Sequence, residues 1–549
     1  MDRRTLLAIA LSFILLTCYQ AFLALYYPSQ SETETSVVSS EIQSDGQSPN
    51  VQVGKGSKGP TVEPKVTAEA APKSKFMISS DPSQKVPFKN NLVEGEIELQ
   101  GGLLSSLSFL KHLDELGPNA RPIHFINNSQ KDIFLAESGY ISTPELALPT
   151  RETLWKASKE TDANGLQMIH LTWENGSGVE FNKTFSFQPN SYLLKVTDRV
   201  INRTKTPLTL YHYVHFLRTE SLPEGQNAMA TADFQGPMGF LDGVRVVHSY
   251  EDIQKQDKTL DAKEGWAGFS DKYFLAALIP NNSTELKQYY FDFDPPAFRV
   301  GEVSGKVTLE PGKDDVVETN LFVGPKEIHV LEALKLKLER SIDYGWFHFL
   351  AEPLVNVLLF FNHYLNNYGL AIIFLTITIK ILFFPLANKS YISMNAMKKL
   401  QPKVEELKKL YANDKQRMNQ EMMKLYQENK VNPLGGCLPI VIQIPVFFAL
   451  YKVLFLSVEM RHTPFFLWIN DLSVHDPYYI LPLLMGVSMY IQSKMNPAPP
   501  DPIQAKVMSF LPLIFTFFFL TFPSGLVLYW LVNNVLSIAQ QGYIIKRNQ

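Results

Sequence analysis

The sequence predicts a multi-pass α-helical membrane protein with six transmembrane helices and a large antiparallel β-sandwich outside the cytoplasm. Long apolar runs are confined to the N-terminus and to residues 346–549. Between them, residues 88–342 alternate β-branched or aromatic residues with polar ones. The net charge of −3 over 549 residues gives no reason to expect direct DNA binding.

Residues 1–27 predict an uncleaved membrane anchor. Arg3 and Arg4 precede the 22 uncharged residues 6–27, a pattern that leaves the N-terminus in the cytoplasm. A cleaved signal peptide is the alternative, but the run exceeds a usual signal core and no small-x-small cleavage site follows it. Cys18 and Cys437 both lie in or beside apolar runs, so no disulfide framework is expected in the soluble part.

The next two regions differ in composition. Residues 28–87 are rich in Ser, Glu, Gln, Lys and Pro, and such a segment is expected to be a disordered tether. Residues 88–342 contain strand-like segments at 179–202, 208–219 and 306–324, which favour one large antiparallel β-sandwich with a terminal helix at 328–340. Its scattered His and Glu residues show no spaced constellation, so we expect satisfied core or surface residues rather than a catalytic site.

Residues 343–549 predict a five-span core. The segment 343–367 mixes aromatic and aliphatic residues with Glu352 and Asn356. It fits either an interfacial helix along the membrane or an early start of the next span. Apolar runs long enough to be spans follow at 368–387, 434–457, 478–493, 507–522 and 525–545.

Loop charge sets the expected topology. Residues 388–432 hold nine lysines and one arginine, whereas residues 457–477 hold only Arg461. Both termini and the 388–432 loop should therefore be cytoplasmic, with the β-domain on the other side, in the periplasm if the cell has an outer membrane. The loop itself predicts a hairpin of two short helices around 412–414, with Pro402 in a first helical turn.

Lys380 is the candidate functional residue of the core. It lies nine residues before Lys389, roughly 13 Å along a helix, in a hydrocarbon core of about 30 Å. No Asp or Glu occurs in the last five spans, so the lysine predicts a water-filled cavity. Tyr529, Asn533, Ser537 and Gln541 form one polar face on the last span, and Gln443 and Thr376 could join it. Polar contacts that only hold helices together are the alternative.

Three stretches of the core resemble the YidC family of membrane protein insertases, in the long form of Gram-negative bacteria. They are QPKVEELKKLYANDKQRMNQEMMKLYQENKVNPLGGCLPIVIQIPVFFALY (401–451), DPYYILPLLMG (476–486) and FPSGLVLYWLVNN (522–534); in the β-domain LFVGPKE (321–327) adds to them. The resemblance implies a supersandwich-like β-domain, similar to sugar mutarotases. It also implies an insertase and chaperone of the inner membrane that catalyses no chemical reaction and needs no cofactor.

The resemblance also implies a site and partners. A cytoplasm-open groove would bind clients through Lys380, Thr376, Gln443, Tyr529, Trp530 and Asn533. Relatives usually carry arginine at the position of Lys380 and Tyr-Tyr at 529–530. The implied partners are nascent membrane proteins, the lipid bilayer, the Sec translocon, and a ribosome or targeting factor at the hairpin.

Two rival functions remain to be weighed. A proton-coupled transporter could use a buried lysine as a proton relay. This sequence argues against it, because its predicted spans have no acidic residue and no inverted repeat is visible. A membrane-anchored carbohydrate enzyme would need a catalytic constellation within residues 88–342.

Overall fold

A computed structural model describes residues 81–129, 132–142, 146–219, 234–281, 285–411, 414–429, 431, 438–496 and 502–547. The predicted anchor 1–27 and nearly all of the predicted tether 28–87 lie outside these residues. The first described strand begins at Lys85, three residues before the expected start of the β-domain.

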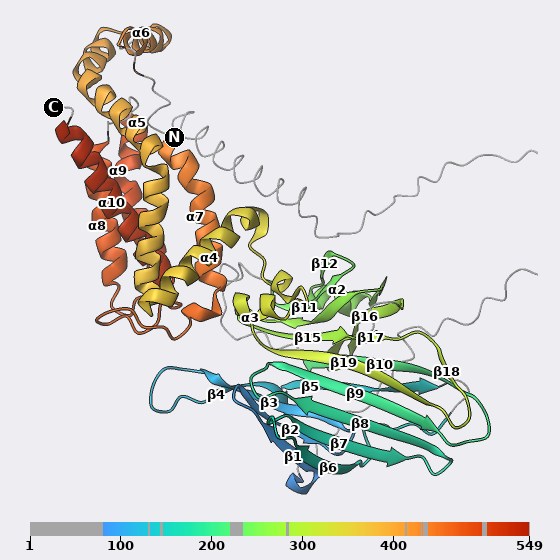
Figure 1. The fold of residues 1–549 in the computed structure, drawn as a ribbon. Coiled ribbons are helices and arrows are strands. Elements are labelled where there is room, and N and C mark those ends of the chain that lie inside the picture. The colour runs from blue at the N-terminus through green and yellow to red at the C-terminus, as the bar shows by residue number, and fades with distance from the viewer. Residues whose placement is uncertain are drawn as a thin grey trace, which may run out of the picture. The chain divides into compact units, whose positions relative to one another are not determined.

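The β-region consists of two antiparallel sheets (Figure 1). The 10-stranded sheet has the order β1 (Lys85–Lys89), β2 (Val93–Glu98), β3 (Leu103–Leu113), β4 (Pro122–Asn128), β5 (Ile133–Ser142), β10 (Leu208–Thr219), β17 (Ala297–Val303), β16 (Lys287–Asp294) and β13 (Lys258–Ala262), with β18 (Val307–Leu309) beside β10. The 9-stranded sheet has the order β12 (Val244–Val247), β11 (Gly236–Leu241), β14 (Gly265–Ser270), β15 (Phe274–Pro280), β19 (Asp314–Pro325), β9 (Leu193–Asn202), β8 (Val179–Phe187), β7 (Gln167–Glu174) and β6 (Lys156–Thr161).

The two sheets pack face to face through an aromatic core. Buried and half-buried residues alternate along the whole of β8, as expected for a strand with one face in the core. Phe88 on β1 stacks on Phe187 on β8, with ring centroids 3.9 Å apart. Phe109 on β3 stacks on Phe274 on β15 at 4.9 Å. The prediction of large antiparallel β-sheets is therefore confirmed.

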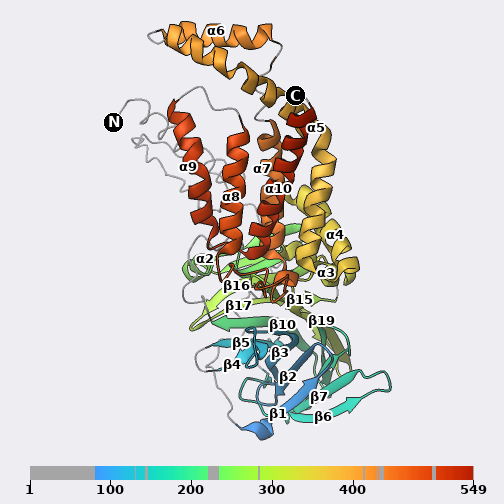
Figure 2. The same cartoon turned by 90° about the vertical axis from the view of Figure 1, so that its left-hand side faces the viewer.

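Helices dominate the C-terminal region, which is also as predicted. They are α4 (His348–Leu365), α5 (Tyr368–Leu410), α6 (Lys415–Glu428), α7 (Leu438–Leu456), α8 (Ile480–Met495), α9 (Pro502–Phe519) and α10 (Ser524–Arg547), with the 3-10 turns η4 (Gly345–Phe347) and η6 (Val458–Met460). The β-region adds η2 (Pro82–Gln84), α2 (Tyr250–Lys255), α3 (Ile328–Ala333) and η3 (Leu338–Ser341). Figure 2 shows α9, α8, α10 and α5 as neighbouring helices in that order, with α10 in contact with both α8 and α5.

Three details differ from the sequence predictions. The helix expected at 328–340 is broken into α3 and η3, because Lys335 and Lys337 adopt left-handed backbone angles, with φ of 56° and 58°. The first hairpin helix is not a separate short helix but the end of α5, whose 43 residues continue from the apolar run. Pro402 consequently lies inside a helix rather than in its first turn.

The segment 343–367 is separated from the following apolar helix. Asn366 adopts a left-handed conformation with φ of 47°, and the Asn367 side chain accepts a hydrogen bond from the Leu370 N–H at 2.9 Å. Asn367 is thus the N-cap of α5. The interpretation of 343–367 as an early start of the next span is wrong.

By length and apolar composition, α5 is the one helix of the described residues that could cross a membrane. Within α7 and α9, the stretches Gln443–Leu456 and Ala505–Phe519 are apolar but shorter.

Candidate functional site

A hollow lies between α5 and α7, and its mostly apolar lining includes the polar side chains of Lys380, Tyr391 and Gln443. Its volume is about 450 Å³, counted to its open mouth. Its lining residues, which define the Lys380 hollow, are Ile379, Lys380, Phe383, Leu386, Ala387, Tyr391, Gln443 and Val446. Lys380 is the one charged residue of this lining. The turns of α5 on either side of it carry only apolar and hydroxyl side chains.

The Lys380 ammonium is held by a serine of the last helix. Lys380 Nζ donates a hydrogen bond of 2.7 Å to Ser537 Oγ on α10. Ser537 Oγ in turn donates to the backbone carbonyl of Asn533 at 2.7 Å. The Tyr391 hydroxyl, about three turns beyond Lys380 on α5, also faces the Ser537 side chain. The acceptor of the Lys380 ammonium is therefore a hydroxyl group, and no ion pair joins Lys380 to an acidic side chain among the described residues.

A second polar contact crosses from α7 to α10. Gln443 Nε2 donates a hydrogen bond of 2.5 Å to the hydroxyl of Tyr529, whose side chain is fully buried. Further along α10, Gln541 Nε2 donates to the Asn496 side-chain oxygen at 3.2 Å. The expected polar face of the last helix exists, and three of its members bond to groups outside α10.

The remaining predicted residues do not all join Lys380. Thr376 is 1% exposed, and its hydroxyl donates to the Ile372 carbonyl of its own helix at 2.7 Å. Trp530 packs edge-on against Phe447, with ring centroids 4.7 Å apart. Asn533 is half-buried on α10, one turn before Ser537. The structure thus brings together Lys380 and Gln443 in the lining of the hollow, with Tyr529 bonded to Gln443.

The sequence interpretation missed Tyr391 and the Asn534–Ser488 contact. Tyr391 lies beyond the apolar run, so nothing in the sequence marked it as part of the cavity. Asn534 Nδ2 donates to Ser488 Oγ on α8 at 3.0 Å, and both side chains are buried. Their small polar side chains in apolar helices were the available signal.

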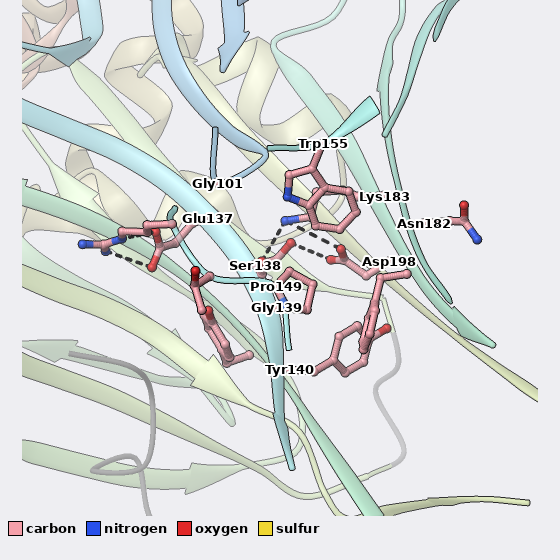
Figure 3. Close-up of a pocket in the computed structure, with 14 residues that line it drawn as sticks. Gly101, Glu137, Ser138, Gly139, Tyr140, Pro149, Trp155, Asn182, Lys183 and Asp198 are labelled. Atoms are coloured by element: carbon pink, nitrogen blue, oxygen red, sulfur yellow. Dashed lines mark hydrogen bonds and ion pairs between the residues drawn. The ribbon is translucent and has the colours of Figure 1, made fainter. Parts of the chain in front are cut away.

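The β-region contains a buried polar cluster that the sequence did not reveal (Figure 3). Arg151 forms two hydrogen bonds to Glu137, at 2.6 and 2.9 Å, and His215 Nε2 lies 2.8 Å from the same carboxylate. Beside it, Lys183 Nζ donates to the Ser138 carbonyl at 2.7 Å and lies 3.8 Å from Asp198. The sequence could not show which of these residues lie together, because pairing strands brings distant positions into contact; that they are satisfied core residues rather than a catalytic site stays a prediction.

The charges in this polar cluster neutralise one another. Burial alone would raise the pKa of Glu137, but Arg151 and His215 hold it well below its usual range. Burial lowers the pKa of Lys183, and Asp198 opposes that shift. Asp198 also accepts hydrogen bonds from Ser138 Oγ at 2.6 Å and from His212 at 3.0 Å.

The space at the polar cluster has a volume of about 410 Å³, counted to its open mouth as for the Lys380 hollow. Glu137, Lys183 and Asp198 are among the residues that line it. Among the described residues, no group of His, Cys, Asp or Glu is arranged to hold a metal ion. The charged groups that line this space are paired with one another, which is typical of a satisfied polar core.

Comparison with known proteins assigns both regions. The family model described as 60Kd inner membrane protein matches residues 360–549, and the model of the YidC periplasmic domain matches residues 85–357. A membrane protein insertase YidC of Magnetococcus marinus is 54% identical across 100% of this chain and 99% of its own length. That of Methylococcus capsulatus is 42% identical across 85% of this chain and 86% of its own.

A crystal structure of an active YidC insertase, with its first transmembrane domain resolved, is 19% identical. It covers 85% of this chain and 94% of its own, with a TM-score of 0.38. The identity to the curated relatives extends over the whole chain, so the assignment does not depend on either region alone. The chain belongs to the YidC family of membrane protein insertases.

Proposed function

We propose that this protein inserts other proteins into the bacterial inner membrane and helps them fold there, working alone or with the Sec translocon. The observation that carries the proposal is the Lys380 ammonium, bonded to Ser537 and lining a hollow in spans without acidic residues. Membership of the insertase family supports it. The protein would act as a chaperone and catalyse no chemical reaction.

The proposed topology has six spans. The anchor 1–27 is followed by the tether 28–87 and the β-domain 88–342 in the periplasm, and by the five-span core 343–549, with both termini in the cytoplasm. Apolar side chains on the outer surfaces of α8 and α9 favour contact with lipid; they include Leu483, Val487, Ile491, Phe510, Leu513 and Phe517, all of them exposed. The 16 residues of α8 span only about 24 Å, so the bilayer would be thin beside it.

The segment 343–367 is proposed to lie along the periplasmic membrane surface. Trp346, Phe349, Phe360 and Tyr364 are exposed, and Glu352 and Asn356 are exposed between them. Aromatic side chains favour the interface between lipid and water, and the intervening polar groups keep the helix from sinking into the hydrocarbon.

In the proposed mechanism, a hydrophilic client segment enters the Lys380 hollow from the cytoplasm. An acidic residue of that segment is attracted by Lys380, and this attraction is much stronger away from bulk water than at the surface. The partly exposed Gln443, Trp530 and Asn533 would offer further contacts along the groove, whereas Thr376 and Tyr529 are buried. Departure of the client towards the periplasm then leaves the ammonium free for the next one.

The hairpin of 388–432 is proposed to receive ribosome-bound or targeting-factor-bound clients. Lys398, Lys399, Lys409 and Lys424 are exposed on the end of α5 and on α6. A basic, exposed surface suits an anionic partner such as ribosomal RNA or anionic lipid, and its attraction should weaken as salt is added.

The test is an insertion assay with two clients that differ only in the sign of two translocated residues. We expect Lys380→Glu to impair the acidic client much more than the basic one, because it reverses the charge in the hollow. Lys380→Arg should act nearly normally, since the charge is kept. Lys389→Glu, an exposed position on the same helix that is not part of the lining of the hollow, is the matched control and should not discriminate. Equal impairment of both clients by stable Lys380→Glu protein would refute electrostatic capture.

A further inference from the structure

We propose that Ser537 is a positioning residue that aims the Lys380 ammonium at client carboxylates, with Tyr391 supporting it. This inference rests on the proposed function and deepens it. In this inference, the preference of the site for acidic client segments depends on the contact between α5 and α10 and not on the lysine alone.

The hydrogen bonds of Ser537 make its hydroxyl oxygen an acceptor for the Lys380 ammonium. Its single proton is committed to the Asn533 carbonyl at 2.7 Å, so its lone pairs must accept. One accepts from Lys380 at 2.7 Å, and the other is left for the phenolic proton of Tyr391. Ser537 is 2% exposed and Tyr391 is 7% exposed, so bulk water does not compete at this point.

The ammonium keeps donors for a client. Lysine has three N–H donors, and Ser537 uses one of them. Ser537 lies on α10, outside the lining of the hollow, whereas Lys380 and Tyr391 are part of that lining. A carboxylate in the hollow could therefore accept from the remaining donors without displacing Ser537.

Holding the ammonium in place matters because the lysine side chain is flexible. Four methylene groups let a free ammonium turn towards water, away from an arriving carboxylate. A bond to a buried hydroxyl removes part of that freedom before the client arrives, which strengthens binding without adding a contact to the client. The rival interpretation is that the Lys380–Ser537 bond only joins two helices.

The two interpretations predict different results for the same client pair, one with acidic and one with neutral translocated residues. If Ser537 positions the ammonium, Ser537→Ala should reduce insertion of the acidic client about tenfold, as expected for loss of a hydrogen bond to a charged group. Insertion of the neutral client should change less than about twofold. Ser537→Thr keeps the hydroxyl and should restore the preference. Tyr391→Phe should act in the same direction with a smaller effect.

Ser488→Ala is the matched control, because Ser488 also accepts an interhelical hydrogen bond to α10, from Asn534, but not at Lys380. It should not discriminate between the clients. Equal reduction of both clients by Ser537→Ala, at normal protein level in the membrane, would overturn the inference in favour of a structural bond. An unchanged acidic client would overturn it too. If Lys380→Glu discriminates between clients of opposite charge and Ser537→Ala does not, only the positioning role fails. If neither discriminates, the proposed capture fails as well.

Discussion

The β-region and the helical region each contain a buried lysine, and they hold it differently. Lys183 is 2% exposed and has two backbone carbonyls and the Asp198 carboxylate around its ammonium. Lys380 has the hydroxyl of Ser537 and lies beside a hollow. Burying a charge is costly unless it is paired. The first lysine is matched inside the protein, whereas the second is left with capacity for a partner from outside.

This difference distinguishes a charge matched within the fold from one that, under the proposed function, is available to a client. A matched charge contributes to folding, and its removal leaves its counter-charge buried without a partner. A charge with only hydroxyl neighbours contributes little to folding, and its removal leaves no opposite charge behind. Variants of the two lysines should therefore have opposite consequences for stability and for insertion.

The largest effect is expected from Lys183→Met. It leaves Asp198 buried without its cation, and breaking such a pair typically costs about 3–5 kcal/mol. Lys380→Met should change the free energy of unfolding by less than about 1 kcal/mol while lowering insertion. Denaturant unfolding of the purified proteins, followed by their β-sheet and helix signals, measures both. Adding Asp198→Asn to Lys183→Met should recover part of the loss. The comparison breaks down if both lysine variants are equally destabilised.

A smaller effect on stability is expected at Glu302, a buried acidic group of the β-region that, unlike Lys183, is not matched by a hydrogen-bond partner in the described part of the chain. Burial raises the pKa of Glu302 to about 7, and neither carboxylate oxygen has a hydrogen-bond partner among the described residues. Between the unfolded value of 4.5 and about 7, the folded state holds a proton that the unfolded state releases. Stability from this group is therefore present at low pH and is lost as pH rises through that window.

Glu302→Gln should remove this pH dependence. We expect it to stabilise the protein by up to roughly 3 kcal/mol above about pH 8 and to have little effect below about pH 4. Thermal unfolding of wild type and variant across that range tests the prediction. Parallel pH profiles for the two proteins would show that Glu302 is ionised and satisfied in the fold, as Glu137 is.

The smallest effect is expected from Thr376→Val. The hydroxyl of Thr376 bonds to its own helix, and valine preserves the branched shape, so the free energy of unfolding should change by less than about 1 kcal/mol. Insertion of acidic and neutral clients should both stay near normal. Reduced insertion of only one of the two clients would place Thr376 in contact with that client. The functional region would then extend to the helical turn before Lys380.

Local patterns in the sequence predicted strands well where one face of the strand is buried along its whole length. The segment 179–202 forms β8 and β9, and 208–219 lies within β10, because alternation records which face of a strand is buried. Pro402 was misleading, because the helix formers before it continue α5 through the expected start of the hairpin.

Contacts between distant positions could not be predicted in the same way. The Lys380–Ser537 bond joins residues 157 positions apart, and it depends on how α10 is rotated against α5. The polar face of α10 could be seen in the sequence, but its partners could not. In the β-region the Glu137–His215 contact depends on the register of β5 and β10, which pairs these two residues directly.

The continuity of α5 has a mechanical consequence. Its 43 residues form a rod of roughly 65 Å that joins the Lys380 turn to the basic hairpin. Pro385 and Pro402 lie inside the rod and remove the amides that would bond the carbonyls of Ile381 and Lys398, so the helix is less stiff at two places between Lys380 and its C-terminal end. A load applied at the hairpin, as the proposed function implies, would bend the helix at these two places before it disturbs the alignment of the Lys380–Ser537 bond.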